Sequence, residues 1–176
     1  NLSWIIPSYV THPDSIFSIT RQVVKTNYEI FGCAIAFEPY YFPEKGEYFS
    51  PYSYMNGDSV ITTQIPKKYN YYSKNWYRIS KELNTARWSR PYHELSAHDI
   101  ITTTYAVPLH NPQKKVIGIF SVDLSMNWMT SLIDSVKLYE DSYSIILNKD
   151  GKYILHPGGT CFLEQENSIF EIASDM

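Results

Sequence analysis

One stretch of the chain gathers aromatic rings and cations, and it therefore raises a chemical question first. Residues 69–94 read YNYYSKNWYRISKELNTARWSRPYHE. Tyrosine joins an apolar ring to a hydroxyl that needs a hydrogen-bond partner, so it suits half-hydrated pockets and interfaces. Such a stretch can wall a small-molecule pocket, face a sugar, hold a nucleic-acid strand or fill a core.

A carboxylate further along the chain supplies the opposite charge. Asp123 lies among apolar residues in IFSVDLS, residues 119–125. A carboxylate in the middle of a β run must be paired, cap a helix or serve a function. A polar or zwitterionic ligand requires a cation, an anion and aromatic faces between them. The residues that offer this combination are Tyr69, Lys74, Trp76, Tyr92, Tyr105 and Asp123.

The same residues allow a purely structural interpretation, which the sequence leaves open. The aromatic side chains can fill a core, and Lys74 can lie on a solvated helix face. Asp123 can cap a helix that begins two residues later.

Enzymatic and metal-binding patterns are missing from the sequence. The five histidines form no HExxH pattern, neither Cys33 nor Cys161 belongs to a CxxC pair, and no glycine-rich phosphate loop or GxSxG elbow occurs. We therefore expect a protein that is not an enzyme and that carries no metal and no cofactor.

Charge and hydropathy limit the partners of the chain. A net charge of −3 over 176 residues gives no general attraction to nucleic acid. The longest apolar run, IFGCAIAF at 30–37, is too short to span a bilayer. No signal peptide opens the chain. We expect an excised domain whose membrane anchors lie outside this sequence.

Hydrophobic periodicity and turn residues predict an α+β fold. Helices and hairpins alternate, which favours an antiparallel sheet with helices packed against it. Asp14 or Thr11 is expected to cap the first helix, Ser73 the second and Ser125 the third. Predicted buried faces are Trp76, Ile79 and Leu83 in the second helix and Met129, Leu132, Ile133 and Val136 in the third. The expected elements are a helix over 12–29, strands over 30–37, 48–54 and 59–65, a helix over 73–84, a hairpin over 99–110 and 114–125, a helix over 125–136, a hairpin over 143–157 and the start of a helix after 166.

An ordered series of motifs resembles the double Cache domain, an extracytoplasmic sensor of bacterial receptors. The matching segments are NWYRISKELNTARWSRPY, IITTTYAVPL, KKVIGIFSVDLSMNWM and YSIILNKDGKYILHP, and they cover roughly residues 30–157. The segments IFGCAIAFEPYYF and YFSPYSY, with NSIFEIA, resemble a branch that precedes PP2C-like sigma-factor-regulating phosphatases, histidine kinases and chemoreceptors.

The resemblance implies a Cache fold with a long N-terminal helix and PAS-like antiparallel modules. It divides the chain into a helical stalk over 1–29, a membrane-distal ligand-binding module over 30–137 and the incomplete start of a membrane-proximal module over 138–176. It also implies a homodimer through the N-terminal helix, and the extracytoplasmic, periplasmic part of an inner-membrane receptor.

The resemblance also assigns roles within the pocket. The amino-acid-binding pattern of the family falls on Tyr69, on Lys74 where the family has arginine, on Trp76 and Tyr77, on Tyr92 and on Asp123. It implies that the cation at 74 holds a ligand carboxylate, and that Asp123 and Tyr92 hold its ammonium group. Lysine acts only as a point charge, without the bidentate fork of arginine.

The expected function is therefore sensing of a small polar metabolite, an amino acid or a related amine or organic acid. A carbohydrate-binding module that uses exposed tryptophan and tyrosine rings is the alternative. A structural dimerisation domain with an empty pocket is a third possibility.

Overall fold

The computed structural model describes residues 12–94, 100–136, 139–140, 142–156 and 160–161. The described residues form two compact units. The first holds the residues up to Ser89 together with Thr104–Asp123, and the second holds Arg90–Thr103 and the residues from Leu124 onward.

The described strands form a seven-stranded sheet and a three-stranded sheet. The larger has the order β3-β2-β1-β7-β6-β4, with β5 paired to β6, and the smaller has the order β10-β9-β8. The prediction of an α+β fold with antiparallel pairing is confirmed. The strands are β1 (Ile30–Phe37), β2 (Pro51–Asn56), β3 (Ser59–Gln64), β4 (Arg87–Trp88), β5 (Tyr92–Glu94), β6 (Ile100–His110), β7 (Val116–Ser125), β8 (Ile146–Leu147), β9 (Tyr153–His156) and β10 (Thr160–Cys161).

Three α-helices and three short 3-10 turns accompany the strands in the described ranges. The α-helices are α2 (Ser15–Thr26), α3 (Asn75–Leu83) and α4 (Met126–Ser135). The 3-10 turns are η2 (Pro43–Lys45), η3 (Lys67–Tyr69) and η4 (Tyr71–Ser73). The predicted helix after 166 lies outside the described residues.

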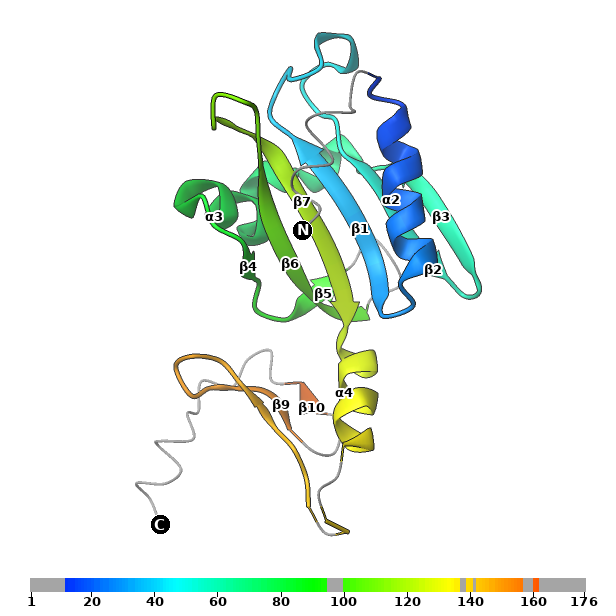
Figure 1. The fold of residues 1–176 in the computed structure, drawn as a ribbon, viewed down its shortest axis with the longest axis vertical. Helices are drawn as coiled ribbons and strands as arrows, with labels where there is room; N and C mark the ends of the chain where they lie inside the picture. The colour runs from blue at the N-terminus through cyan, green and yellow to red at the C-terminus, as the bar shows by residue number, and fades with distance from the viewer. Residues whose placement is uncertain (1–11, 95–99, 137–138, 141, 157–159, 162–176) are drawn as a thin grey trace. The chain divides into compact units, whose positions relative to one another are not determined.

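Helix α2 covers one face of the larger sheet, in front of β1 and β2 in Figure 1. Its Ile16 and Val24 belong to the same buried cluster as Cys33 and Ile35 of β1. One buried polar contact crosses this apolar layer: the hydroxyls of Thr20 and Ser53 lie 2.9 Å apart, and both residues are fully buried. Ser53 therefore faces α2.

The opposite face of the sheet follows from strand alternation, because successive side chains point to opposite sides. Ser53 faces α2, so its neighbours Tyr52 and Tyr54 face away from it. Cys33 lies opposite Ser53 in the register, so Gly32 and Ala34 also face away. Figure 1 shows the chain between β3 and the end of α3 passing behind the sheet, on this second side.

Two helix caps differ from the prediction. Ser73 does not cap α3: its hydroxyl donates to the Asn70 carbonyl, and Lys74 occupies the N-cap position. The left-handed backbone of Asn70 starts the 3-10 turn η4, which displaces the helix start by one residue. Asp14 is the N-cap residue of α2 but makes no capping bond, and it pairs with Lys45 at 2.6 Å instead. Thr11 lies outside the described residues.

Two predicted buried faces are also wrong in part. Leu83 is 58% exposed at the end of α3, whose buried residues are Trp76, Tyr77 and Ser80. Val136 and Leu132 of the α4 region are likewise exposed, whereas Met126 is buried. Helical spacing defines an apolar stripe but not the element that covers it. Ser125 does occupy the N-cap position of α4, without a side-chain capping bond.

The second unit contains the predicted second hairpin. Strands β8 and β9 pair around Asn148, whose side-chain oxygen accepts from the amides of Asp150 and Lys152. Gly151 has a φ of 74°, which favours glycine at this point of the turn. No helix within the described residues is long and apolar enough to cross a membrane.

The Thr20–Ser53 contact gives a first prediction. Thr20→Val keeps the β-branched shape and removes the hydroxyl, while Ser53 keeps its contact with Thr62 at 2.9 Å. We expect the free energy of unfolding to fall by about 1 kcal/mol, measured by urea denaturation. Thr26→Val is the matched control, because its hydroxyl makes exposed bonds at the end of the same helix, to the Gln22 carbonyl and from the Asn27 side-chain amide. Equal losses for the two variants would contradict a role for the buried contact.

Candidate functional site

Asp123 is a buried carboxylate held by the neighbouring strand. Its side chain lies on β7 and is 6% exposed. The Thr104 hydroxyl on β6 donates to Asp123 Oδ1 at 2.7 Å, and this bond is buried. Helix α4 begins at Met126 with Ser125 as its N-cap. The capping interpretation of Asp123 is therefore replaced by a cross-strand pairing.

The carboxylate faces the side of the sheet away from α2. A Cβ atom built on Gly32 of β1 would lie 2.8 Å from Asp123 Oδ2 and 2.7 Å from the Tyr52 hydroxyl oxygen. Glycine at position 32 therefore lets a phenol and a carboxylate approach the backbone of β1. Ala34 and Ala36 continue a row of small side chains along this face of the strand.

The electrostatic effect of Asp123 reaches the other face of β1. Burial raises the pKa of the Cys33 thiol well above its usual value, and the nearby Asp123 carboxylate raises it further. Cys33 is fully buried and is a small core residue, as its apolar surroundings predict.

Three of the predicted site residues come together at the start of α3. The Trp76 indole Nε1–H donates to the Tyr69 hydroxyl at 3.4 Å. The Lys74 ammonium lies 4.5 Å from the centre of the Tyr69 ring, a cation–π distance. Trp76 is 7% exposed and Lys74 is partly exposed. Turn η4 and the extended backbone of Lys74 bring these side chains together, because they fold the chain back before the helix begins.

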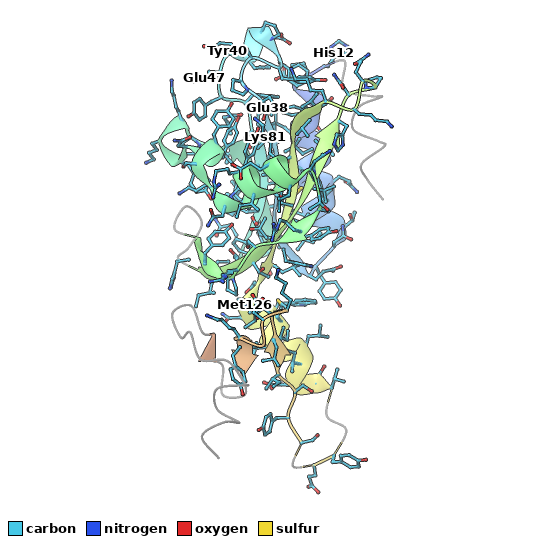
Figure 2. All side chains as sticks on the ribbon, turned by 90° about the vertical axis from the view of Figure 1, so that its left-hand side faces the viewer. His12, Glu38, Tyr40, Glu47, Lys81 and Met126 are labelled. Carbon is cyan, nitrogen blue, oxygen red and sulfur yellow. The ribbon has the colours of Figure 1, made fainter. Side chains whose placement is uncertain are left out.

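Tyr77 has a different set of contacts from its predicted neighbours. Its hydroxyl donates to Glu38 Oε1 at 2.5 Å, and Lys81 Nζ lies 2.6 Å from the other oxygen of Glu38. Figure 2 shows Glu38 and Lys81 close together. These bonds attach α3 to the residue that follows β1, so Tyr77 holds the helix that carries Trp76.

Two further tyrosines hold the same region by backbone contacts. The Tyr71 hydroxyl donates to the Phe37 carbonyl at 2.9 Å, and the Tyr72 hydroxyl donates to the Glu47 carbonyl at 2.5 Å. The rings of Tyr71 and Tyr77 lie 5.3 Å apart. These tyrosines form a buried, hydrogen-bonded scaffold, as expected for aromatic residues that fill a core.

Tyr105 is placed apart from these groups. Tyr105 follows Thr104 on β6, so alternation turns it to the opposite face from the hydroxyl that binds Asp123. Its ring lies 5.0 Å from that of Trp88, its partner on β4. Tyr92 belongs to the second unit, on β5, opposite Thr102. The structure thus groups Tyr69 with Lys74 and Trp76, but it does not bring Tyr105 to the carboxylate.

Sequence reasoning missed Gly32, Tyr52 and Thr104 as neighbours of Asp123. A glycine inside an apolar strand is a sign of close approach by another group, and Thr104 lies in the polar run TTT of an otherwise apolar strand. Neither signal identifies the partner, because the contacts join segments far apart in the chain. Within the described ranges, no group of three or more histidine, cysteine or acidic side chains could hold a metal ion.

Comparison with known proteins identifies a matching protein family. Residues 16–131 match the family model described as methyl-accepting chemotaxis protein-like, first PDC sensor domain. The methyl-accepting chemotaxis protein PscA of Pseudomonas syringae pv. tomato is 22% identical over 114 residues, which is 65% of this chain and 18% of PscA. This chain spans less than a fifth of the length of the curated relatives that it matches.

Solved structures share the fold. A structure of methyl-accepting chemotaxis protein X superposes with a TM-score of 0.77 at 17% identity, over 96% of this chain and 67% of that one. The ligand-binding domain of the amino acid chemoreceptor PctB of Pseudomonas aeruginosa, in complex with L-Arg, gives a TM-score of 0.62 at 19% identity, over 89% of this chain and 59% of that one.

The buried tyrosines give a prediction about alkaline pH. Burial, and then hydrogen bonds to Tyr72 and Glu38 respectively, raise the pKa values of Tyr71 and Tyr77 far above the usual value. The folded chain therefore keeps these phenols neutral while the unfolded chain ionises them above about pH 10. The stabilisation is complete below that pH and is lost above it, at about 1.4 kcal/mol per pH unit for each phenol.

Urea denaturation at several alkaline pH values measures this slope. Tyr77→Phe should reduce the loss of unfolding free energy by about 1.4 kcal/mol per pH unit, because one buried phenol is removed. Tyr28→Phe, at an exposed tyrosine, should leave it unchanged. A slope that Tyr77→Phe does not alter would show that Tyr77 ionises in the folded state.

Proposed function

The chain belongs to the family of methyl-accepting chemotaxis protein-like first PDC sensor domains, and on that premise we propose that it senses a small polar metabolite that carries an ammonium group. The metabolite is an amino acid or a related amine, bound on the face of the larger sheet away from α2. The domain lies outside the cytoplasm, on the periplasmic side of a membrane receptor.

The buried Asp123 carboxylate is the observation that carries this proposal. A carboxylate accepts hydrogen bonds, and a ligand ammonium group offers three N–H donors to such an acceptor. Thr104 binds one carboxylate oxygen from the neighbouring strand, which holds the side chain in one orientation. The carboxylate therefore has a fixed position on the face of the sheet away from α2, where a ligand ammonium group can donate to it.

The cluster of Tyr69, Lys74 and Trp76 at the start of α3 supports a ligand that also carries a carboxylate. Lys74 brings a positive charge beside the Tyr69 ring, and Trp76 donates to the hydroxyl of the same tyrosine. A carboxylate can pair with this ammonium as a point charge, and the aromatic rings can contact the apolar part of the ligand. The bound L-Arg of PctB supports an amino acid as the class to test first.

We further propose that α2 transmits the bound state. It packs on the sheet face opposite to Asp123 and is bonded to β2 through Thr20 and Ser53. Tyr52, the residue before Ser53, lies beside Asp123. A ligand that moves Tyr52 would therefore act on the helix, which in a homodimer would pair with its twin and lead to the membrane.

The carbohydrate-binding alternative receives less support. Sugar platforms need exposed and coplanar rings, but Trp76 is buried. Trp88 is 50% exposed, and its ring is inclined at 44° to that of Tyr105. A dimerisation domain without a ligand remains the alternative that a negative binding screen would support.

Asp123→Asn tests the ammonium site. The whole chain is screened by thermal shift against amino acids, amines and organic acids, and each binder is then measured by calorimetry. We expect the substitution to weaken ammonium-bearing binders at least about 30-fold, because an opposed buried charge is lost. Asp134→Asn, at an exposed acidic residue of α4, is the control and should change nothing. An unchanged dissociation constant in Asp123→Asn would place the binding site elsewhere.

Lys74→Gln tests the carboxylate end separately. Binders with both an ammonium and a carboxylate should weaken by about tenfold, because a hydrogen bond to a charged group is lost. Diamines without a carboxylate should bind equally well or better. Lys68→Gln is the matched control on an exposed lysine of η3. Equal losses for both ligand classes would mean that Lys74 supports the fold of the pocket without contacting a carboxylate.

A further inference from the structure

The side chains of Asp123 and Tyr52 both lie against the backbone of β1 at Gly32. The Cβ position of Gly32 lies within 3 Å of the Tyr52 hydroxyl oxygen and of Asp123 Oδ2, and 3.0 Å from a ring carbon of Tyr52. Any larger residue at position 32 would have to displace one of the two side chains. The phenol and the carboxylate therefore share one small, filled corner of the sheet.

Tyr52 is held in this corner by its own surroundings. It lies on β2 opposite Ala34 of β1, whose small side chain leaves space for the ring. The ring stacks on that of Tyr54 with 5.5 Å between the centres, and its hydroxyl oxygen is buried. Thr104 binds Asp123 Oδ1 from the opposite side, at 2.7 Å. The two oxygens of Asp123 thus have different neighbours: Thr104 at Oδ1, and the Tyr52 corner at Oδ2.

We infer that Tyr52 and Thr104 position the Asp123 carboxylate, and that Tyr52 is a specificity-determining residue that makes the site select a primary ammonium group over a hydroxyl. This inference rests on the proposed function, because it concerns the same site. It assigns to Tyr52 a role in ligand choice that the family pattern on residues 69–123 does not include.

The chemistry follows from the donors that each ligand group offers. A primary ammonium group has three N–H donors and can donate to the carboxylate and to the phenol oxygen together, whereas a hydroxyl has a single donor. Bonds to charged groups are about twice as strong as neutral ones.

Tyr52→Phe tests the inference in the complete 176-residue chain. The probes are the twenty L-amino acids, and, for each that binds the wild-type chain, its 2-hydroxy acid, all measured by calorimetry. The preference for the amino acid over its 2-hydroxy acid should fall by about tenfold in the variant. A merely structural role would weaken both ligands alike and would leave this ratio unchanged.

Tyr54→Phe is the matched control, because it removes a hydroxyl from the same face of the same strand. It should leave the ratio unaltered. Thr104→Val should reduce binding of the amino acid, and Thr104→Ser, which keeps the donor to Asp123, should restore it. The thermal midpoint of each variant without ligand shows whether the fold is kept.

The outcomes separate this inference from the proposed function. If the wild-type chain binds none of the amino acids, the proposed function and the inference both fail. If it binds one, and Tyr52→Phe keeps the preference for ammonium over hydroxyl, the inference alone is overturned. If Thr104→Ser fails to restore what Thr104→Val loses, a positioning hydrogen bond from Thr104 is also excluded.

Discussion

The arrangement of the first unit depends on how one buried charge is accommodated. Asp123 is 6% exposed in the middle of a strand, where an unpaired carboxylate would be strongly destabilising. On the neighbouring strand β6, the Thr104 hydroxyl donates a hydrogen bond to Asp123 Oδ1 at 2.7 Å. On the other side of β7, strand β1 has Gly32, so that the Asp123 carboxylate and the Tyr52 phenol can lie against its backbone. Gly32 on β1 and the Thr104 hydroxyl on β6 thus accommodate this carboxylate inside the sheet.

The two faces of the sheet use different interactions. The α2 face is an apolar layer crossed by the single described pair of hydroxyls at Thr20 and Ser53. The opposite side is held by tyrosine hydroxyls that bond to backbone carbonyls and to Glu38. These bonds fix the segment that carries Trp76 without filling the sheet face with aliphatic side chains. The hydrogen-bonded tyrosines give this side a rigid scaffold, and Asp123 with Thr104 gives it polar groups. Selective binding of a small polar molecule requires both.

Local features of the sequence predict most helices and strands. They predict the site only in part, because some of its contacts join segments that are far apart in the chain. Strand β1 and the hairpin β6–β7 were predictable because apolar runs and turn residues are local signals. Tyr69, Lys74 and Trp76 meet because they are close in the chain. The neighbours Gly32 and Tyr52 of Asp123 depend on strand pairing across many residues, which periodicity does not encode. Ser73 does not cap α3, because the left-handed backbone of Asn70 starts a 3-10 turn just before the helix. Tyr105 faces the opposite side of β6 from the Thr104 hydroxyl, because side chains alternate along a strand.

The central claim is that the Asp123 carboxylate binds the ammonium group of a ligand. A crystal structure of the chain grown with an amino acid selected by the thermal-shift screen tests it most directly. The account predicts the ligand nitrogen at about 3 Å from an Asp123 carboxylate oxygen, with the apolar part of the ligand against Trp76. A ligand that lies on the opposite face, for example on the exposed Trp88 ring, or one whose nitrogen makes no contact with Asp123, would contradict it.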